Sequence, residues 1–355
     1  MGLATGATLA GCGGEATSDN TPANWAWLRT DYDTDDAWQR TFERMRTSGI
    51  DGVIIHEDRL FPDATAGLQA DPDPRPLELA QQAGLTPQVW VVAMRREELL
   101  EAHPDWFAVN REGVSTAEDP PYVDYYRFLS PCVPGVRNYL ADYVDRLGQI
   151  DALQAIHLDY IRFPDVILPE AIQPTYDLTQ DREMAQFDYG YHPMCRDAFA
   201  SAVGVDPMTL DDPAAHQEWV QFRHDQITQV VRRLGDAAHQ RNKQVTAAVF
   251  PTPDIARRLV RQDWPSWNLD AVMPMIYHNF YHKDIPWIET ATRQGVEALP
   301  AGTPLYSGLF VPEIAPGRVP DAVRAARDGG ARGITLFNVD AMTEAHWSAL
   351  ASVAT

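Results

Sequence analysis

An acidic and a basic side chain follow a short apolar run in the middle of the chain. The run Ala155–Leu158 is rich in strand-forming residues, and Asp159 stands where that strand should end. A carboxylate at the carboxyl end of a buried parallel strand, with a guanidinium nearby, is common in α/β-barrel active sites. We therefore expect Asp159 to be catalytic, as an acid/base or a nucleophile. Arg162 could hold Asp159 ionised by lowering its pKa, or could instead form a structural pair with Asp165.

Polar and aromatic residues also end most of the other apolar runs. Aromatic rings can stack on sugar rings, and amides, imidazoles and guanidinium groups can hold hydroxyl groups. This mixture suits a carbohydrate ligand, although the tryptophans could equally be core residues. Besides Arg162, the side chains expected to bind it are Trp27, His56, Trp90, Tyr277, His278 and Asn338.

A second carboxylate is normally needed to hydrolyse a glycosidic bond. It stands about 5 Å from the first for retention of configuration, or roughly 6.5–9.5 Å away for inversion. Glu57 and Asp340 are the first candidates, with Asp254 and Glu313 further out. Glu57 could instead pair with Arg59, and Asp340 could belong to the start of the last helix.

Eight short apolar runs alternate with amphipathic stretches along the chain. The runs are apolar on both faces, as strands of a parallel sheet between helices are. Eight such units close best as a (β/α)₈ TIM-type barrel, in which the carboxyl ends of the strands share one face. The predicted strands are Trp25–Leu28, Gly52–Ile55, Pro87–Val92, Ala155–Leu158, Val245–Phe250, Ala271–Ile276, Leu305–Leu309 and Gly333–Phe337. The helices predicted with definite limits are Asp35–Ser48, Pro76–Ala83, Gly135–Leu147, His216–Gln240 and Glu344–Val353.

Two long loops interrupt this pattern after the third and fourth strands, over residues 103–134 and 165–215. Loops of this length inside a compact domain are usually functional. The first strand is not followed by the glycine-rich turn of a dinucleotide-binding fold, and no P-loop or nucleophile elbow is present. We expect no cofactor. His278 and His282 have the spacing of metal ligands on a helix but lack the rest of such a motif, so a metal-dependent hydrolase is only a third alternative.

The composition describes an acidic globular protein. The 355 residues carry a formal net charge of −21, which opposes binding to nucleic acid phosphates. Residues 24–355 are expected to form one barrel domain. No run after the first 23 residues is long enough to span a membrane.

The first 23 residues suggest export. Residues 1–11 are small and apolar, and the run Leu9–Cys12 looks like a bacterial lipobox, in which Cys12 would carry the lipid. The basic segment of a signal peptide is missing, so this is either a signal remnant or a chance likeness. Residues 12–23 have the composition of a flexible tether. We expect an exported protein held at the membrane by its lipid anchor only; Cys132 and Cys195 could pair there, or both could be buried thiols.

The run His157–Pro164 resembles the strand-four signature of the glycosyl-hydrolase-like family 10 lipoproteins and related glycoside hydrolases. Other segments resemble the family in the same order along the chain. They are Phe128–Pro131, Trp219, Phe222–Arg223, Leu269–Tyr277 and Gly330–Phe337. The resemblance covers nearly all of the chain after the tether and implies a TIM-type barrel. Many members have a second acidic residue where this chain has Tyr160, so the resemblance does not assign the second carboxylate.

Together these observations predict an exported glycoside hydrolase that acts on an extracellular or cell-wall polysaccharide by carboxylate chemistry. The alternative is a lipoprotein barrel that binds carbohydrate without cleaving it. The sugar, the linkage and the stereochemical outcome do not follow from the sequence.

Overall fold

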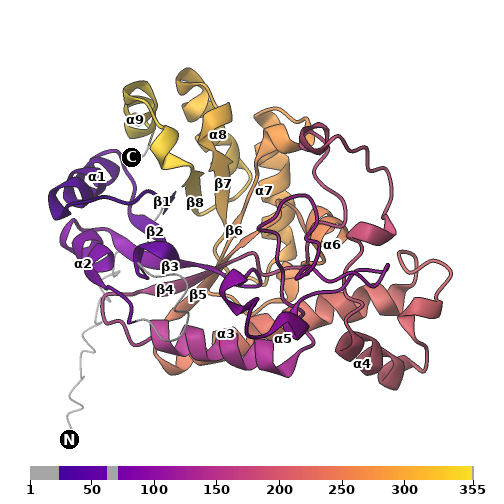
Figure 1. Ribbon diagram of the computed structural model, residues 1–355. Helices are drawn as coiled ribbons and strands as arrows, with labels where there is room; N and C mark the ends of the chain where they lie inside the picture. Colours follow the sequence, from indigo (N-terminus) through magenta and orange to yellow (C-terminus); the bar gives the residue numbers. More distant parts are fainter. Residues whose placement is uncertain (1–23, 62–70, 354–355) are drawn as a thin grey trace, which may run out of the picture.

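Eight parallel strands with helices around them form the computed structural model, which describes residues 24–61 and 71–353 (Figure 1). The strands lie side by side in the order β6-β5-β4-β3-β2-β1-β8-β7. Two isolated parallel bridges, Val272–Leu305 and Met275–Gly308, join β6 to β7, so that the sheet is a nearly closed barrel. The strands are β1 (Asn24–Leu28), β2 (Gly52–His56), β3 (Thr86–Val92), β4 (Ala155–Asp159), β5 (Gln244–Val249), β6 (Ala271–Pro274), β7 (Tyr306–Phe310) and β8 (Gly333–Phe337). The predicted TIM-type barrel is confirmed.

The helices alternate with the strands and lie outside them in Figure 1. They are α1 (Asp35–Thr47), α2 (Arg75–Gln82), α3 (Pro134–Leu147), α4 (Pro193–Val203), α5 (Gln217–Gln240), α6 (Pro253–Val260), α7 (Pro286–Ala298), α8 (Val319–Asp328) and α9 (Glu344–Ala351). The sequence did not predict α4, which lies within the second long loop. Strand β6 ends two residues earlier than predicted, because the amides of Ile276 and Tyr277 turn back to the carbonyls of Pro274 and Met275.

Alternate residues of each strand face the barrel interior and the helices, as the period of two requires. One cluster of apolar side chains fills the interior: Trp25, Trp27, Ile54, Trp90, Ala248, Ala271, Met273 and Tyr306. A second, larger cluster includes Ile156 and Leu158 of β4. It follows that β4 directs His157 and Asp159 toward the interior and its apolar residues toward the helices.

A chain of hydrogen bonds crosses the barrel interior. The indole Nε1 of Trp27 donates to Nε2 of His157 at 2.9 Å, and Nδ1 of His157 lies 2.8 Å from Oγ1 of Thr246. That hydroxyl donates to Oε1 of Gln88 at 2.7 Å. Because an indole can only donate, Nε2 of His157 accepts and the ring proton stays on Nδ1. Burial lowers the pKa of His157 to about 3, so the ring is neutral.

Gly308 lets β7 approach β6 at the seam of the barrel. A Cβ atom at this position would lie 2.6 Å from the carbonyl oxygen of Pro274 and 3.1 Å from the ring of Trp27. Such contacts are far inside normal van der Waals distances. A larger residue at position 308 would therefore push the seam apart.

The two long loops are fastened to one another. A disulfide joins Cys132, before α3, to Cys195 in α4, with 5.2 Å between the Cα atoms. Nδ2 of Asn110 also donates to the carbonyl of Gln186 at 3.0 Å. Of the two states left open by the sequence for these cysteines, the structure has the paired one. The predicted signal and tether, residues 1–23 with Cys12, lie outside the described residues.

No helix within residues 24–61 and 71–353 combines the length and the apolar character that crossing a membrane demands.

His157 should make the stability of the barrel depend on pH. The ring stays neutral in the folded protein down to about pH 3 but is protonated below about pH 6.5 when unfolded, so stability is lost as the pH falls through this window. This group alone costs up to about 1.4 kcal/mol per pH unit. In His157→Gln, the slope of the unfolding free energy between pH 6.5 and 4 should be smaller than in the wild type. Exposed His282, changed to Asn, serves as the control, and equal slopes for wild type and His157→Gln would contradict the account.

Candidate active site

A pocket of about 530 Å³ opens at the carboxyl ends of the strands, and we call it the central pocket. Its size is typical of a site for a small molecule or a few sugar units. Asp159 and Val92, which end the paired strands β4 and β3, both line it. Of the residues predicted for the site, six line this pocket: Trp27, His56, Trp90, Asp159, Arg162 and Tyr277.

The Asp159 carboxylate is fixed by two donors. The indole Nε1 of Trp90 donates to Oδ2 at 2.9 Å, and the backbone amide of Tyr160 donates to Oδ1 at 2.6 Å. Tyr160 takes a left-handed backbone conformation, with φ at 49°. This is a costly conformation for a residue with a side chain, and such residues cluster at functional sites.

Burial raises the pKa of Asp159, because the ionised form loses water that the pocket replaces only in part. The Tyr160 amide, Arg162 and the Trp90 indole act in the opposite direction without cancelling this effect. Of the two roles that the sequence left open for Arg162, lowering the pKa of Asp159 is therefore present but outweighed by burial. Arg162 is committed elsewhere: its NH1 lies 2.8 Å from Oδ2 of Asp165, which is the pairing that the sequence offered as the alternative.

His56 lies beside Trp90, with the two ring centres 4.9 Å apart. Its Nδ1 is 3.2 Å from Oδ2 of Asp58, and the hydrogen bond from His56 lowers the pKa of that carboxyl. Nε2 of His56 has no hydrogen-bond partner among the residues that the structure describes. The imidazole is thus held at one nitrogen and open to a ligand at the other.

Aromatic rings form much of the rest of the central pocket. Tyr277 stacks on Phe337 with 6.0 Å between ring centres and 16° between planes. Burial raises the pKa of Tyr277 well above its usual value, so the hydroxyl stays neutral. Three further lining residues were not predicted for the site, namely Arg95, Phe250 and Phe337. Period-two alternation, extended one residue beyond β5 and to the last residue of β8, would have found the two phenylalanines.

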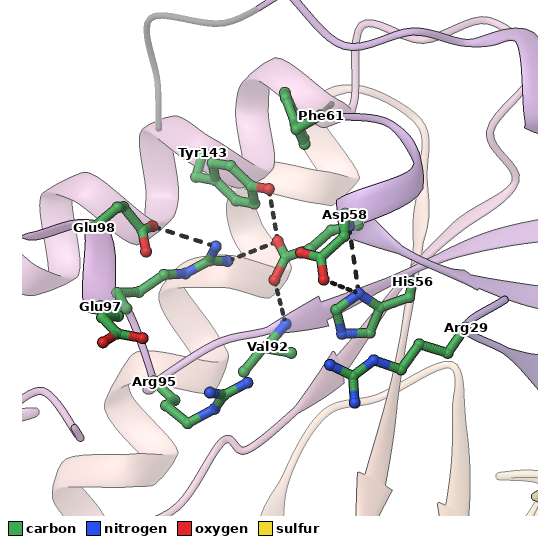
Figure 2. Close-up of a pocket in the computed structure, with 11 residues that line it drawn as sticks. Arg29, His56, Asp58, Phe61, Val92, Arg95, Glu97, Glu98 and Tyr143 are labelled. Atoms are coloured by element: carbon green, nitrogen blue, oxygen red, sulfur yellow. Dashed lines mark hydrogen bonds and ion pairs between the residues drawn. The ribbon is translucent and has the colours of Figure 1, made fainter. Parts of the chain in front are cut away.

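Glu57 does not line the central pocket. It faces a neighbouring cavity of about 230 Å³ between the ends of β2 and β3, the side cavity, which Tyr143 and Val92 also line (Figure 2). Its Oε2 accepts from NH2 of Arg96 at 3.0 Å and from the Tyr143 hydroxyl at 2.6 Å, and its Oε1 accepts from the Val92 amide at 2.8 Å. With both oxygens engaged, Glu57 is built as a structural carboxylate.

The other three predicted site residues also lie outside the central pocket. Asn338 Oδ1 accepts from the amide of Asp340 at 3.0 Å and so caps the short turn after β8. Asp340 is exposed and lines a surface hollow beside α1. His278 is buried in the turn after β6, where burial lowers its pKa. Within residues 24–61 and 71–353, no group of three or more His, Cys, Asp or Glu side chains is placed to hold a metal ion.

Comparisons with known proteins agree with this architecture. The family described as Glycosyl hydrolase-like 10 matches residues 77–323. The glycoside hydrolase domain of PgaB (BpsB) from Bordetella bronchiseptica is 13% identical, with a TM-score of 0.66 over 94% of this chain and 98% of that one. The catalytic domain of β-amylase from Paenibacillus polymyxa is 11% identical, with a TM-score of 0.64 over 93% and 97%. A β-galactosidase from the Antarctic haloarchaeon Halorubrum lacusprofundi is 12% identical, with a TM-score of 0.62 over 93% of this chain and 57% of that one. At these identities the likeness shows the fold alone. A comparison with curated proteins finds no match.

The contacts of Glu57 predict that the loss of Arg96 lowers the unfolding free energy. Arg96→Met would leave the Glu57 carboxylate buried without its counter-charge, which typically costs about 3–5 kcal/mol of unfolding free energy. Chemical denaturation would measure this loss. Arg318→Met, which breaks an exposed pair with Asp321, is the matched control and should change stability little. Similar small losses in both variants would show that the Glu57 cluster is not a structural one.

Proposed function

This chain belongs to the glycosyl hydrolase-like 10 family, and from that premise we propose that it hydrolyses glycosidic bonds in the central pocket, with Asp159 as the proton donor. The observation that carries the proposal is the raised pKa of Asp159 within a pocket walled by aromatic rings. A general acid must hold its proton near the working pH, and burial is the usual means of achieving this for a carboxyl group.

The bound sugar would meet the acid at the rim of the barrel. Trp90 both donates to Asp159 and lines the pocket, so a sugar stacked near its ring would lie within reach of the carboxyl. Tyr277 and Phe337 offer further ring faces. His56, open at Nε2, is a second group in this pocket that can exchange a proton or bind a hydroxyl.

The substrate we propose is an extracellular or cell-wall polysaccharide, and the protein would be exported and anchored through Cys12. The Cys132–Cys195 disulfide supports export, because disulfides persist mainly in oxidising compartments. The relatives of known structure are described as enzymes or domains that act on carbohydrates, which supports a carbohydrate substrate.

One observation favours a second candidate function, a barrel that binds carbohydrate without cleaving it. Among the described residues that line the central pocket, the second carboxylate is Asp165, and it is already occupied. Its Oδ2 accepts from Arg162 at 2.8 Å and from the Tyr126 hydroxyl at 3.1 Å. A catalytic pair of free carboxylates, as in most glycoside hydrolases, is therefore not formed by these two residues.

Replacing Asp159 with Asn separates the two functions. If Asp159 is the acid, Asp159→Asn should lower the rate of sugar release by about 10²–10⁴-fold while glycan binding persists. Wild type and variant would be incubated with a panel of polysaccharides, peptidoglycan included, and reducing ends counted. Asp236→Asn, on the exposed face of α5, is the control. Binding by the wild type with no product from any member would favour the binding barrel, and product at an unchanged rate in Asp159→Asn would reject the assignment.

The Trp90 hydrogen bond predicts a shift in the pH profile. This bond favours the ionised form of Asp159, so Trp90→Phe should raise the pKa of the acid further. The protonated acid then persists to higher pH, and the alkaline limb of kcat/KM should move up by about 0.5–1 pH unit, the equivalent of a hydrogen bond worth about 1 kcal/mol. Trp347→Phe in α9 is the control. An alkaline limb that stays in place or moves to lower pH in Trp90→Phe would contradict this role of the Trp90 hydrogen bond.

A further inference from the structure

We propose that the central pocket recognises a glycan that bears an acidic substituent, a carboxylate or a sulfate ester, and that Arg29 and Arg95 hold this group. The inference rests on the proposed function only in taking the ligand to be a glycan. It is carried by two guanidinium groups that line the pocket without a carboxylate partner.

Arg29 directly follows β1 and lines both the central pocket and the side cavity. It is exposed, and no hydrogen bond or ion pair joins it to another residue in the described part of the chain. Most arginines of this acidic protein are paired; Arg59, for example, lies 2.7 Å from Asp31. An arginine left unpaired at the mouth of a pocket is available to a ligand.

Arg95 follows β3 and lines the same two spaces. Its guanidinium lies over the rings of Tyr125 and Tyr160, 5.1 Å and 5.2 Å from their centres. Its nearest hydrogen-bond acceptor is the carbonyl of Tyr125, at a long 3.5 Å, and its buried Nε has no partner. Two rings therefore orient the guanidinium plane, while only one long hydrogen bond uses its donors. This is the arrangement that binds a planar or tetrahedral anion with little loss of entropy.

The two arginines reach the same place from separate strands. In Figure 2 their side chains extend toward one another from the ends of β1 and β3, near His56 and Val92. The latter two residues also line the central pocket, in which Asp159 lies. An acidic group held by Arg29 and Arg95 would thus belong to a sugar at or next to the one that meets Asp159.

The charges around the central pocket favour an anion. Its described lining holds three arginines and two aspartates, and Arg162 and Asp165 neutralise each other. Two arginines, Arg29 and Arg95, then remain beside one carboxylate, that of Asp159. The pocket is therefore a positive region in a chain of net charge −21.

The carboxylates of the adjoining side cavity do not satisfy these arginines. Asp58 lies 3.2 Å from Nδ1 of His56, and Arg29 is the smallest of the charges that lower the pKa of Asp58. Glu57 and Glu98 both pair with Arg96. Glu97 is exposed and forms no ion pair with any described residue. No carboxylate lies within ion-pair distance of Arg29 or Arg95 in the described structure, so the position is open to a carboxylate or sulfate of a ligand.

Binding to matched pairs of polymers tests the inference. Alginate, polygalacturonate, hyaluronan and peptidoglycan glycan strands would be immobilised beside their carboxyl-reduced forms, and dextran sulfate beside dextran. Biolayer interferometry at low and high salt would measure the full-length protein, Arg29→Gln, Arg95→Gln and the control Arg232→Gln, an exposed arginine on α5. We expect the wild type to prefer at least one acidic member over its neutral partner by tenfold or more. Each pocket variant should lose most of that preference, the control should keep it, and it should weaken as salt screens the charges.

The pairs separate the two sources of the anion, since carboxyl reduction removes only carboxylates and the dextran pair differs only in sulfate. Equal binding of acidic and neutral partners, no binding to any acidic member, or a preference unchanged in both pocket variants would overturn the inference. The failure of this inference remains distinct from the failure of the proposed function, because anion binding and sugar release are separate measurements and only sugar release should be lost in Asp159→Asn. An acidic preference without sugar release in the wild type would reject hydrolysis but not the anion site, whereas sugar release from neutral members alone would do the reverse.

Discussion

The burial of one carboxyl group at the rim of a nearly closed barrel is the physical constraint on which the chemistry of this site depends. Asp159 ends the fourth strand, and the period of the strand directs it inward while its apolar neighbours face the helices. The loops that follow the third and fourth strands supply rings that exclude water above it, so its charged form is disfavoured. The Trp90 indole and the Tyr160 amide then decide where the carboxyl points.

The acidic residues at this end of the barrel differ in role because their surroundings differ, not because their side chains do. Glu57 is as buried as Asp159, but an arginine, a tyrosine hydroxyl and a backbone amide satisfy it completely. Asp165 is likewise held by Arg162. Asp159 receives two hydrogen bonds but forms no ion pair, and burial raises its pKa because these contacts do not offset the loss of water. The same pairing leaves Arg29 and Arg95 as the cations of the pocket that no carboxylate neutralises.

The strands could be predicted from the sequence because their apolar runs have strand character. The position of Asp159 could be predicted because the chain changes from apolar to charged residues at the end of the fourth strand. The sequence could not place Glu57, Asn338 or Asp340, because the residues after β2 and β8 enter short 3₁₀ turns that rotate their side chains away from the pocket. The pairing of Arg162 with Asp165 was one of two open alternatives, and only coordinates could decide between them. Helix α4 escaped detection because it lies among the prolines and tyrosines of a long loop.

The central claim is that Asp159 holds its proton above the usual range of an aspartate, and a direct titration of this one group tests it. Carbon-13 NMR of protein labelled at aspartate Cγ, compared with Asp159→Asn to assign the signal, would follow its carboxyl through the pH. We predict a midpoint clearly above the ordinary aspartate value of about 3.9. A midpoint at or below that value would contradict the account.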